Sequence, residues 1–270
     1  MKKFLVPIDF SDTSIHAAEY AVKIAQSLPE AQLFLYHVYS KISFSALTST
    51  DEGSRQKVSE LELESIKNKI ANGFNNISCV VEDGSFLENI AEHTLSHDID
   101  LVIMGITGSS KISQVFMGTN TLNVIRHISC PVMIIPPNAE YTGMKKVLFT
   151  SDFDDVARTT PFVALSKILD TFKPSLDILN VDSEHYVELT EEFKLERDAM
   201  EMKLNQYHPE FSFLRAFDFL DGINEYVEAK HIDAIITVPR KHSFISQLFK
   251  TSHTKKLAYH STVPIIAIPE

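Results

Sequence analysis

The sequence KKFLVPIDFSD at residues 2–12 recurs as KKVLFTSDFDD at residues 145–155, with six of eleven positions identical. Two further blocks recur in the same order: IDLVIMG (99–105) as IDAIITV (232–238), and SCPVMIIPP (129–137) as STVPIIAIPE (261–270). Three matching blocks in one order indicate a duplicated domain. The sequence therefore predicts one domain over residues 1–138 and a second over residues 144–270, joined near PPNAEYTG at 136–143.

Within each repeat, short β-branched apolar segments alternate with longer amphipathic segments, which predicts alternating strands and helices. The strands expected in the N-terminal repeat are 4–8, 32–38, 77–81, 101–104 and 132–135, and the helices are 13–27, 54–72, 86–96 and 119–127. The strands expected in the C-terminal repeat are 146–151, 176–181, 211–217, 234–238 and 265–268. This alternation predicts two tandem α/β domains, each a Rossmann-like, open and mostly parallel five-stranded sheet of order 3-2-1-4-5 with helices on both faces.

The bulk composition excludes several classes of protein. The 270 residues carry a formal net charge of −11, which argues against a nucleic-acid-binding surface, because such surfaces cluster Lys and Arg against phosphate. No apolar stretch approaches the roughly 18 residues needed to span a membrane, so no membrane partner is expected. The two cysteines, Cys79 and Cys130, both lie in the N-terminal repeat, which fits a reduced, cytoplasmic compartment and small core side chains.

A glycine-rich segment follows the fourth predicted strand, MGITGSSKISQVFMGTNT at residues 104–121. Three of the eight glycines of the chain lie in it, Gly105, Gly108 and Gly118, and the third opens a predicted helix. Glycine permits a positive φ and lets backbone N–H groups approach phosphate oxygens, and a helix N-terminus favours an anion. Hydroxyl donors are available from Ser109, Ser110, Thr119 and Thr121. The segment predicts a phosphate site, and the alternative is a set of ordinary turn glycines.

The C-terminal repeat has a weaker version of this segment, TVPRKHSFISQLFKTSHT at residues 237–254, in which Val238, Lys241 and Thr251 stand where the glycines were. Pro239 fixes φ and removes a donor, so close wrapping of a phosphate by the backbone should fail there. We expect this repeat to keep the fold and to have lost or altered the pocket. The rival interpretation is an anion site made by side-chain charge, from Arg240, Lys241, Lys250, Lys255 and Lys256.

The pattern G-x2-G-x9-G-[S/T], an Asp closing the first strand in VPIDFSD, and the buried CPVMIIP strand together resemble the universal stress protein family, as a tandem member. The resemblance implies an ATP- or AMP-type ligand at Gly105, Gly108, Gly118 and Thr119, with Ser109, Asn120 and Thr121 contributing. Val38 would line the adenine pocket beside Pro7, and Asp9 would lie near the ribose or a Mg²⁺-bridged phosphate. The alternative for Asp9 is helix capping, which Ser11 or Asp12 could also supply.

The sequence favours a binding protein over an enzyme, and it names no catalytic residue. The chain lacks G-x-x-x-x-G-K-[ST], G-x-G-x-x-G and G-x-S-x-G motifs, so no positioned base or phosphate-binding lysine is evident. His37 lies beside the expected pocket, where a lone histidine is more often a packed, hydrogen-bonded residue than a catalyst. Three hypotheses stay open: a cytoplasmic stress or regulatory protein that binds an adenine nucleotide, a slow Mg²⁺-dependent hydrolase or phosphotransferase, and a ligand-free scaffold.

Two expectations concern assembly and access. The fifth strands, PVMIIP and PIIAIP, are apolar and would lie at sheet edges, so we expect the two repeats to pair through them, and a homodimer of the whole chain is plausible. The long polar connection at residues 41–53 could act as a lid over the nucleotide, and the alternative is that it is merely mobile.

Overall fold

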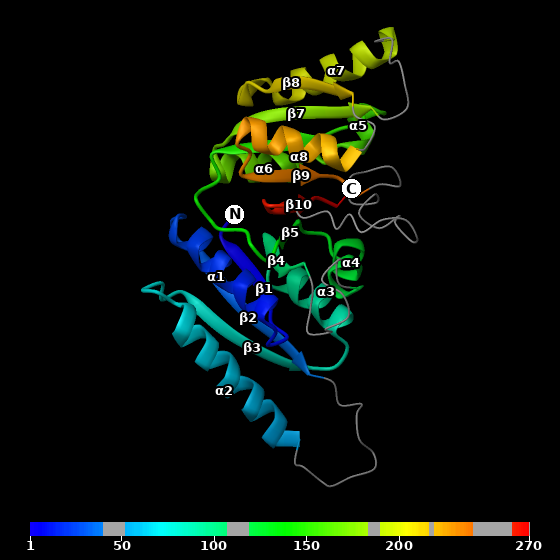
Figure 1. The fold of residues 1–270 in the computed structure, drawn as a ribbon. Helices are drawn as coiled ribbons and strands as arrows, with labels where there is room; N and C mark the ends of the chain where they lie inside the picture. Colours follow the sequence, from blue (N-terminus) through cyan, green and yellow to red (C-terminus); the bar gives the residue numbers. More distant parts are fainter. Residues whose placement is uncertain (40–51, 107–118, 183–189, 216–218, 240–260, 270) are drawn as a thin grey trace. The chain divides into compact units, whose positions relative to one another are not determined.

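A computed structural model describes residues 1–39, 52–106, 119–182, 190–215, 219–239 and 261–269. The chain forms two compact units, Met1–Pro137 and Asn138–Glu270, which correspond to the N-terminal and C-terminal repeats. In Figure 1 the first runs from blue to green and the second from green to red. Among the described residues, no helix is both long and apolar enough to cross a membrane.

The N-terminal repeat is a parallel sheet with strand order β3-β2-β1-β4-β5. Its strands are β1 (Lys3–Pro7), β2 (Gln32–Tyr39), β3 (Ile77–Asp83), β4 (Leu101–Gly105) and β5 (Val132–Ile135). Its helices are α1 (Asp12–Gln26), α2 (Glu52–Ile70), α3 (Phe86–Ser96) and α4 (Thr119–His127). Right-handed crossovers place α1 and α2 on one face and α3 and α4 on the other, and each pair is in contact (Figure 1).

The C-terminal repeat has the same order, β8-β7-β6-β9-β10, again with all strands parallel. Its strands are β6 (Lys146–Thr150), β7 (Ser175–Asp182), β8 (Glu210–Arg215), β9 (Ala234–Thr237) and β10 (Ile265–Ala267). Its helices are α5 (Val156–Thr159), α6 (Phe162–Phe172), α7 (Glu191–Leu204) and α8 (Phe219–Lys230), with the 3-10 turn η1 (Asn205–Tyr207). The predicted α/β fold and the strand order 3-2-1-4-5 are thus confirmed in both repeats.

A shared detail supports the duplication. The carboxylate of Asp100 accepts hydrogen bonds from the backbone N–H groups of Lys2 and Lys3, at 2.6 and 3.0 Å. The carboxylate of Asp233 accepts from Lys145 and Lys146 in the same way, at 2.7 and 2.8 Å. In each repeat this aspartate precedes the fourth strand and fixes the start of the first strand beside it. The KK and ID sequences that recur in the two repeats are therefore in contact in the folded protein, although they lie far apart in the chain.

The core strands are buried as expected for a parallel sheet covered by helices. Every residue of β5, β9 and β10 is buried, as are four of the five residues of β4. The strand β3 differs, because only Ile77 is buried and most of its other residues are half-buried. It pairs with β2 along one side only among the described strands, which explains the weaker burial.

One local prediction is wrong: Cys79 and Cys130 are free, as expected, but they are half-buried and not core residues. Burial nevertheless raises the pKa of the Cys79 thiol to about 12, with a smaller contribution from Glu64, so its thiolate is disfavoured. In the C-terminal repeat the helical segment after β6 is broken into α5 and α6 at Thr160 and Pro161, because proline has no N–H for helix continuation.

Candidate functional site

The carboxyl ends of three adjacent strands meet in the N-terminal repeat at the point where strand order reverses. β1 pairs with β2 on one side and with β4 on the other. Pro7 pairs with Tyr36, so Val38 and Asp9 continue beyond this level on neighbouring strands. Gly105 ends β4. In open parallel sheets such a reversal point is where ligands bind. The structure therefore brings Pro7, Asp9, Val38 and Gly105 to one edge, as the sequence predicted.

Asp9 lies in a tight turn between β1 and α1. Its Oδ1 accepts hydrogen bonds from the backbone N–H of Ser11, at 3.1 Å, and from the Ser11 hydroxyl. Ser11 in turn is the N-cap of α1, and its Oγ accepts from the N–H of Ser14 at 3.2 Å. The cap is thus Ser11, and Asp9 supports it while remaining exposed. An exposed carboxylate at a strand end can accept hydrogen bonds from hydroxyl groups or bind Mg²⁺.

His37 has a structural contact. Its Nδ1 lies 2.7 Å from the carbonyl oxygen of Ile8, and because a carbonyl only accepts, Nδ1 carries the proton. Its ring packs on Phe10 at 4.5 Å between centroids, and Phe10 adopts a left-handed backbone with φ 63°. In the C-terminal repeat Asn180 occupies the same position of β7 and donates to Ser151 O at 2.9 Å. The shared bond indicates that this position fixes the turn after the first strand.

Gly105 has a role that the sequence did not indicate. Its backbone is not in the left-handed region, so a positive φ does not explain the glycine. A Cβ at this position would lie 2.7 Å from the carbonyl oxygen of Thr13 and 2.9 Å from its carbonyl carbon. The missing side chain lets the first turn of α1 pack on the end of β4. Glycine at 105 is therefore required for packing, and this corrects the expectation of a flexible turn at this residue.

The first turn of α4 is tied to the same point. Thr121 is 3% exposed, and its hydroxyl donates to the carbonyl oxygen of Gly105 at 3.2 Å. Its donor is thus used inside the protein and not presented to a ligand. Asn120 on the same turn is exposed. α4 begins at Thr119, as predicted. The remaining residues of the glycine segment, Gly108, Ser109, Ser110 and Gly118, lie outside the described residues.

The C-terminal repeat keeps the turn after its first strand, but aromatic side chains pack beside that turn. Asp152 accepts from the N–H of Asp154 at 3.3 Å, as Asp9 does from Ser11, and Phe153 is left-handed like Phe10. Phe153 is buried within an aromatic cluster that also contains Phe193, Phe211 and Phe213.

Helix α7 also supplies a carboxylate to this part of the C-terminal repeat. Glu196 accepts a hydrogen bond from the N–H of Val156, the first residue of α5, at 2.8 Å. Val238, which corresponds to Gly105, is buried. Side chains of the repeat itself therefore occupy space beside its first strand. The loop that carries Arg240, Lys241, Lys250 and Thr251 lies outside the described residues, as do Lys255, Lys256 and most of the connection at 41–53.

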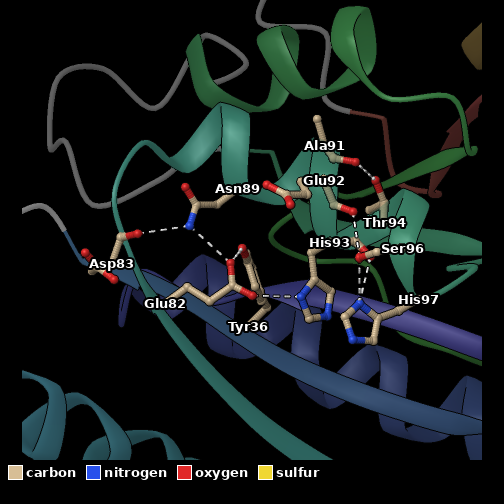
Figure 2. Close-up of polar contacts among 10 residues, drawn as sticks. All are labelled: Tyr36, Glu82, Asp83, Asn89, Ala91, Glu92, His93, Thr94, Ser96 and His97. Atoms are coloured by element: carbon tan, nitrogen blue, oxygen red, sulfur yellow. Dashed lines mark hydrogen bonds and ion pairs between the residues drawn. The ribbon is translucent and has the colours of Figure 1, made fainter.

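Sequence reasoning missed a polar cluster beside the candidate site. Figure 2 shows Glu82 of β3 receiving hydrogen bonds from Tyr36, Asn89 and His93. Burial alone would raise the pKa of Glu82, but these three bonds outweigh it, so its pKa lies below the ordinary value. Burial also raises the pKa of Tyr36, and Glu82 reinforces the effect. In the sequence, Glu82 simply follows the apolar segment of β3, and nothing marks it as the centre of a cluster.

Comparisons with known proteins agree with the fold. A model of the Usp family, described as the universal stress protein family, matches residues 1–136, which is half of the chain. Two universal stress proteins of Methanocaldococcus jannaschii are 28% identical over 141 residues and 30% identical over 155 residues. Each aligns with 50% of this chain, and the alignments cover 81% and 94% of those proteins.

Among solved structures, a universal stress protein from Archaeoglobus fulgidus superposes with a TM-score of 0.72 at 16% identity. The match covers 99% of this chain and 98% of that one, so it extends through both repeats and shows a common fold. Each repeat is therefore an open, parallel α/β domain with this strand order. With the family match over its N-terminal half, the chain belongs to the universal stress protein family.

Proposed function

We propose that the protein is a stress-response or regulatory protein that binds one adenine nucleotide, of the ATP or AMP type, in its N-terminal repeat. The observation that carries the proposal is the convergence of Pro7, Asp9, Val38 and Gly105 at the strand-order reversal, next to the N-terminus of α4. Such an edge suits a nucleotide, with the base between strand ends and the phosphates near a helix N-terminus. Family membership supports the same ligand class.

The binding residues divide by the chemistry they offer. Val38 is half-buried and offers an apolar wall for the base, while Asp9 offers a carboxylate to the ribose hydroxyls. The segment from Gly105 to Thr119, with Gly108, Ser109 and Gly118, would supply backbone and hydroxyl donors to the phosphates. The described residues contain no group of three or more His, Cys, Asp or Glu side chains that could hold a metal. A Mg²⁺ ion at Asp9 would therefore take most of its ligands from phosphates and water.

One nucleotide per chain is proposed because the repeats differ at this edge. In the C-terminal repeat, the space beside the first strand holds the aromatic cluster around Phe153. Glu196, which accepts a hydrogen bond from Val156, lies in the same region. The N-terminal repeat has the smaller Gly105 at the position of the buried Val238. Nucleotide binding without rapid turnover would make occupancy a signal that alters conformation or partner binding. Pairing of the repeats through their fifth strands and dimerisation of the chain stay predictions.

A calorimetric titration with ATP and with AMP tests the proposal, and it offers a matched pair of variants. Asp9→Asn keeps an oxygen for the Ser11 turn but removes the charge, so we expect it to weaken binding by roughly tenfold. Asp152→Asn makes the same change in the equivalent turn and should leave affinity unchanged. Gly118→Val should abolish binding. Equal losses in both Asp variants, or no binding by the wild type, would contradict the proposal.

The enzymatic alternative is tested by following nucleotide conversion over time and not by measuring affinity. Incubation of the protein with ATP and Mg²⁺, followed by chromatography of the nucleotides, reveals any conversion. We expect ATP to stay intact throughout a long incubation, because no positioned base has been identified at the site. Steady accumulation of ADP that is lost in Asp9→Asn would instead assign a hydrolase or phosphotransferase. Mass spectrometry of small molecules released from the purified protein distinguishes both from a ligand-free scaffold.

A further inference from the structure

Helix α3 ends with two histidines on one face. His93 lies in its last turn and His97 is its C-cap, so the two are four residues apart. Their rings are stacked, with centroids 4.0 Å apart and planes within 14° of parallel (Figure 2). Of the eleven histidines in the sequence, no other two lie three or four residues apart. Two histidines at this spacing are zinc ligands in the H-E-x-x-H motif, but Thr94 replaces its glutamate, so this pair offers metal ligands without a general base.

The first ring is held in the tautomer that leaves Nε2 for a metal. His93 Nδ1 lies 2.9 Å from Glu82 Oε1, and because a carboxylate accepts, Nδ1 carries the proton and the neutral ring has its lone pair on Nε2. Tyr36 and Asn89 donate to Oε2 of the same carboxylate, at 2.6 and 3.1 Å, which fixes Glu82 in place. Metal-ligating histidines almost always donate their other ring N–H to a carboxylate or a carbonyl group, because this orients the ring and raises its basicity. His93 therefore has the support that a metal ligand requires.

The Nε2 of His93 is a buried acceptor without a partner. His93 is 5% exposed, and among the described residues no donor reaches its Nε2. A buried polar atom in this state costs free energy that a packed histidine with both nitrogens bonded does not lose. The exposed ring of His97 is stacked on the His93 ring, so rotation of His97 is the movement that would open this nitrogen to a cation. The unpaired nitrogen distinguishes this pair from two histidines that serve only packing.

The second ring has the same tautomer. His97 Nδ1 lies 3.2 Å from the carbonyl oxygen of His93, and because a carbonyl only accepts, Nδ1 carries the proton. The Ser96 hydroxyl lies 3.0 Å from the same nitrogen and donates its own proton to the carbonyl oxygen of Glu92 at 2.8 Å, so it also accepts from His97. In both neutral rings the lone pair is therefore on Nε2.

The C-terminal repeat has a different pair at these two helix positions. The corresponding residues of α8 are Tyr226 and Lys230, seven and eleven residues after the start of the helix. The Lys230 ammonium lies 6.0 Å from the centre of the Tyr226 ring, and the Tyr226 hydroxyl donates to Asp177 at 2.8 Å. An ammonium group has no lone pair, so this pair cannot chelate a metal. In that repeat a cation that belongs to the chain lies beside the aromatic ring.

The surroundings of the histidine pair favour positive charge. The last carbonyl groups of a helix carry partial negative charge, and both histidines lie in or directly after the last turn of α3. Glu82 adds a carboxylate behind His93, and its side chain is only 32% exposed. Lys3 donates to the carbonyl oxygen of His97 at 2.8 Å, which offsets part of this negative charge. The remaining field attracts a cation to the exposed side of the pair.

We propose that His93 and His97 bind a divalent first-row transition metal, of the Cu²⁺ or Zn²⁺ type, at the C-terminal end of α3. Imidazole suits these metals, whereas Mg²⁺ and Ca²⁺ prefer oxygen ligands. The His97 ring turns out of the stack until its Nε2 lone pair converges with that of His93, about 2.0–2.1 Å from the ion. Water completes the coordination, because the described residues provide no third His, Cys, Asp or Glu ligand there.

This metal site does not rest on the proposed nucleotide site. His97 precedes β4, so it lies toward the amino end of that strand, and Lys3, which bonds it, is the first residue of β1. The nucleotide is proposed at the carboxyl ends of the same strands. A bound ion joins the last turn of α3 to the residue that leads toward β4, and it stabilises the folded N-terminal repeat because the unfolded chain does not hold the two rings together.

Calorimetric titration of the full chain with Cu²⁺, Zn²⁺ and Mg²⁺, without an affinity tag and without nucleotide, tests the proposal. The wild type should bind one tight Cu²⁺ per chain, Zn²⁺ more weakly and Mg²⁺ not at all. His97→Lys takes the residue of the other repeat, and His93→Gln keeps a donor for Glu82. Each should lower Cu²⁺ affinity by roughly 10- to 100-fold, because one imidazole is left. The control is His127→Asn, which removes a histidine bonded to Asn123 O at 2.7 Å without a second histidine nearby in sequence, and it should bind Cu²⁺ as the wild type does.

Electron paramagnetic resonance of the Cu²⁺-loaded chain identifies the ligands directly. The wild type should show coupling to two imidazole nitrogens and His97→Lys to one. Because His97 is exposed, His97→Lys should unfold at the wild-type temperature in the absence of metal, so that its loss of binding is not a loss of fold. Wild-type Cu²⁺ affinity in both His97→Lys and His93→Gln, an equal loss in His127→Asn, or no binding of Cu²⁺ or Zn²⁺ by the wild type would overturn the proposal.

Discussion

Substitution of Gly105 by Ala tests the packing at the end of β4. The added Cβ would lie 2.7 Å from the Thr13 carbonyl oxygen, a distance that Cβ atoms essentially never show. The two elements must separate by about 0.7 Å to reach the 3.4 Å at which ordinary contact begins. The carbonyl oxygen and carbon of Thr13 are backbone atoms and cannot rotate away as a side chain could, so α1 or β4 has to move. Overpacking of this kind costs about 1–3 kcal/mol of the free energy of unfolding.

The assay for this variant is thermal or urea denaturation followed by hydrogen exchange, which assigns the loss to one repeat. For a unit of this size a loss of 1 kcal/mol lowers Tm by about 4 °C, so we expect a decrease of roughly 4–12 °C in the N-terminal repeat. Val238→Ala, at the corresponding position of the C-terminal repeat, is the matched control and should leave the N-terminal transition unchanged. Stability of Gly105→Ala within about 0.5 kcal/mol of wild type would refute the packing argument.

Three further predictions concern buried polar contacts. Thr121→Val removes the hydrogen bond to Gly105 O and should cost about 1 kcal/mol in urea denaturation, whereas an unchanged midpoint would show that the bond contributes nothing. Lys146→Met removes the cation 3.1 Å from Asp177, which is 1% exposed, and should cost about 3 kcal/mol in the C-terminal repeat; Lys146→Met together with Asp177→Asn should recover part of that loss. Because the pKa of Glu82 is lowered, its stabilising effect is complete above the ordinary value of 4.5 and is lost as pH falls through the folded value, so acid denaturation of Glu82→Gln should show a smaller pH slope than wild type.

The fold was predictable because its signals are local and repeated. Apolar strands such as Leu101–Gly105 and Val132–Ile135 are buried without alternation, and the helices α3 and α4 begin and end where their periodicity does. Comparison of the repeats supplied the domain organisation. The break between α5 and α6 at Pro161 is a local signal of the same kind, since proline interrupts a helix at this position.

The site was only partly predictable because several of its contacts join residues far apart in the chain. The helix cap at Ser11 is local, and the sequence offered it as a candidate. The approach of Gly105 to Thr13 depends on how a helix lies on a strand, which no spacing reveals. The bond between Glu82 and His93 likewise joins β3 to α3 through the packed sheet. Motif reasoning therefore found the edge of the sheet but not the contacts that hold it.

The central claim is that an adenine nucleotide binds at the strand-order reversal of the N-terminal repeat alone. Hydrogen exchange of the full chain with and without saturating ATP locates the ligand most directly. The account predicts protection of peptides that cover 5–14, 36–39 and 104–121, with no change at 148–157 or 237–254. Protection in the C-terminal repeat, or no protection in any peptide at saturating nucleotide, would contradict it.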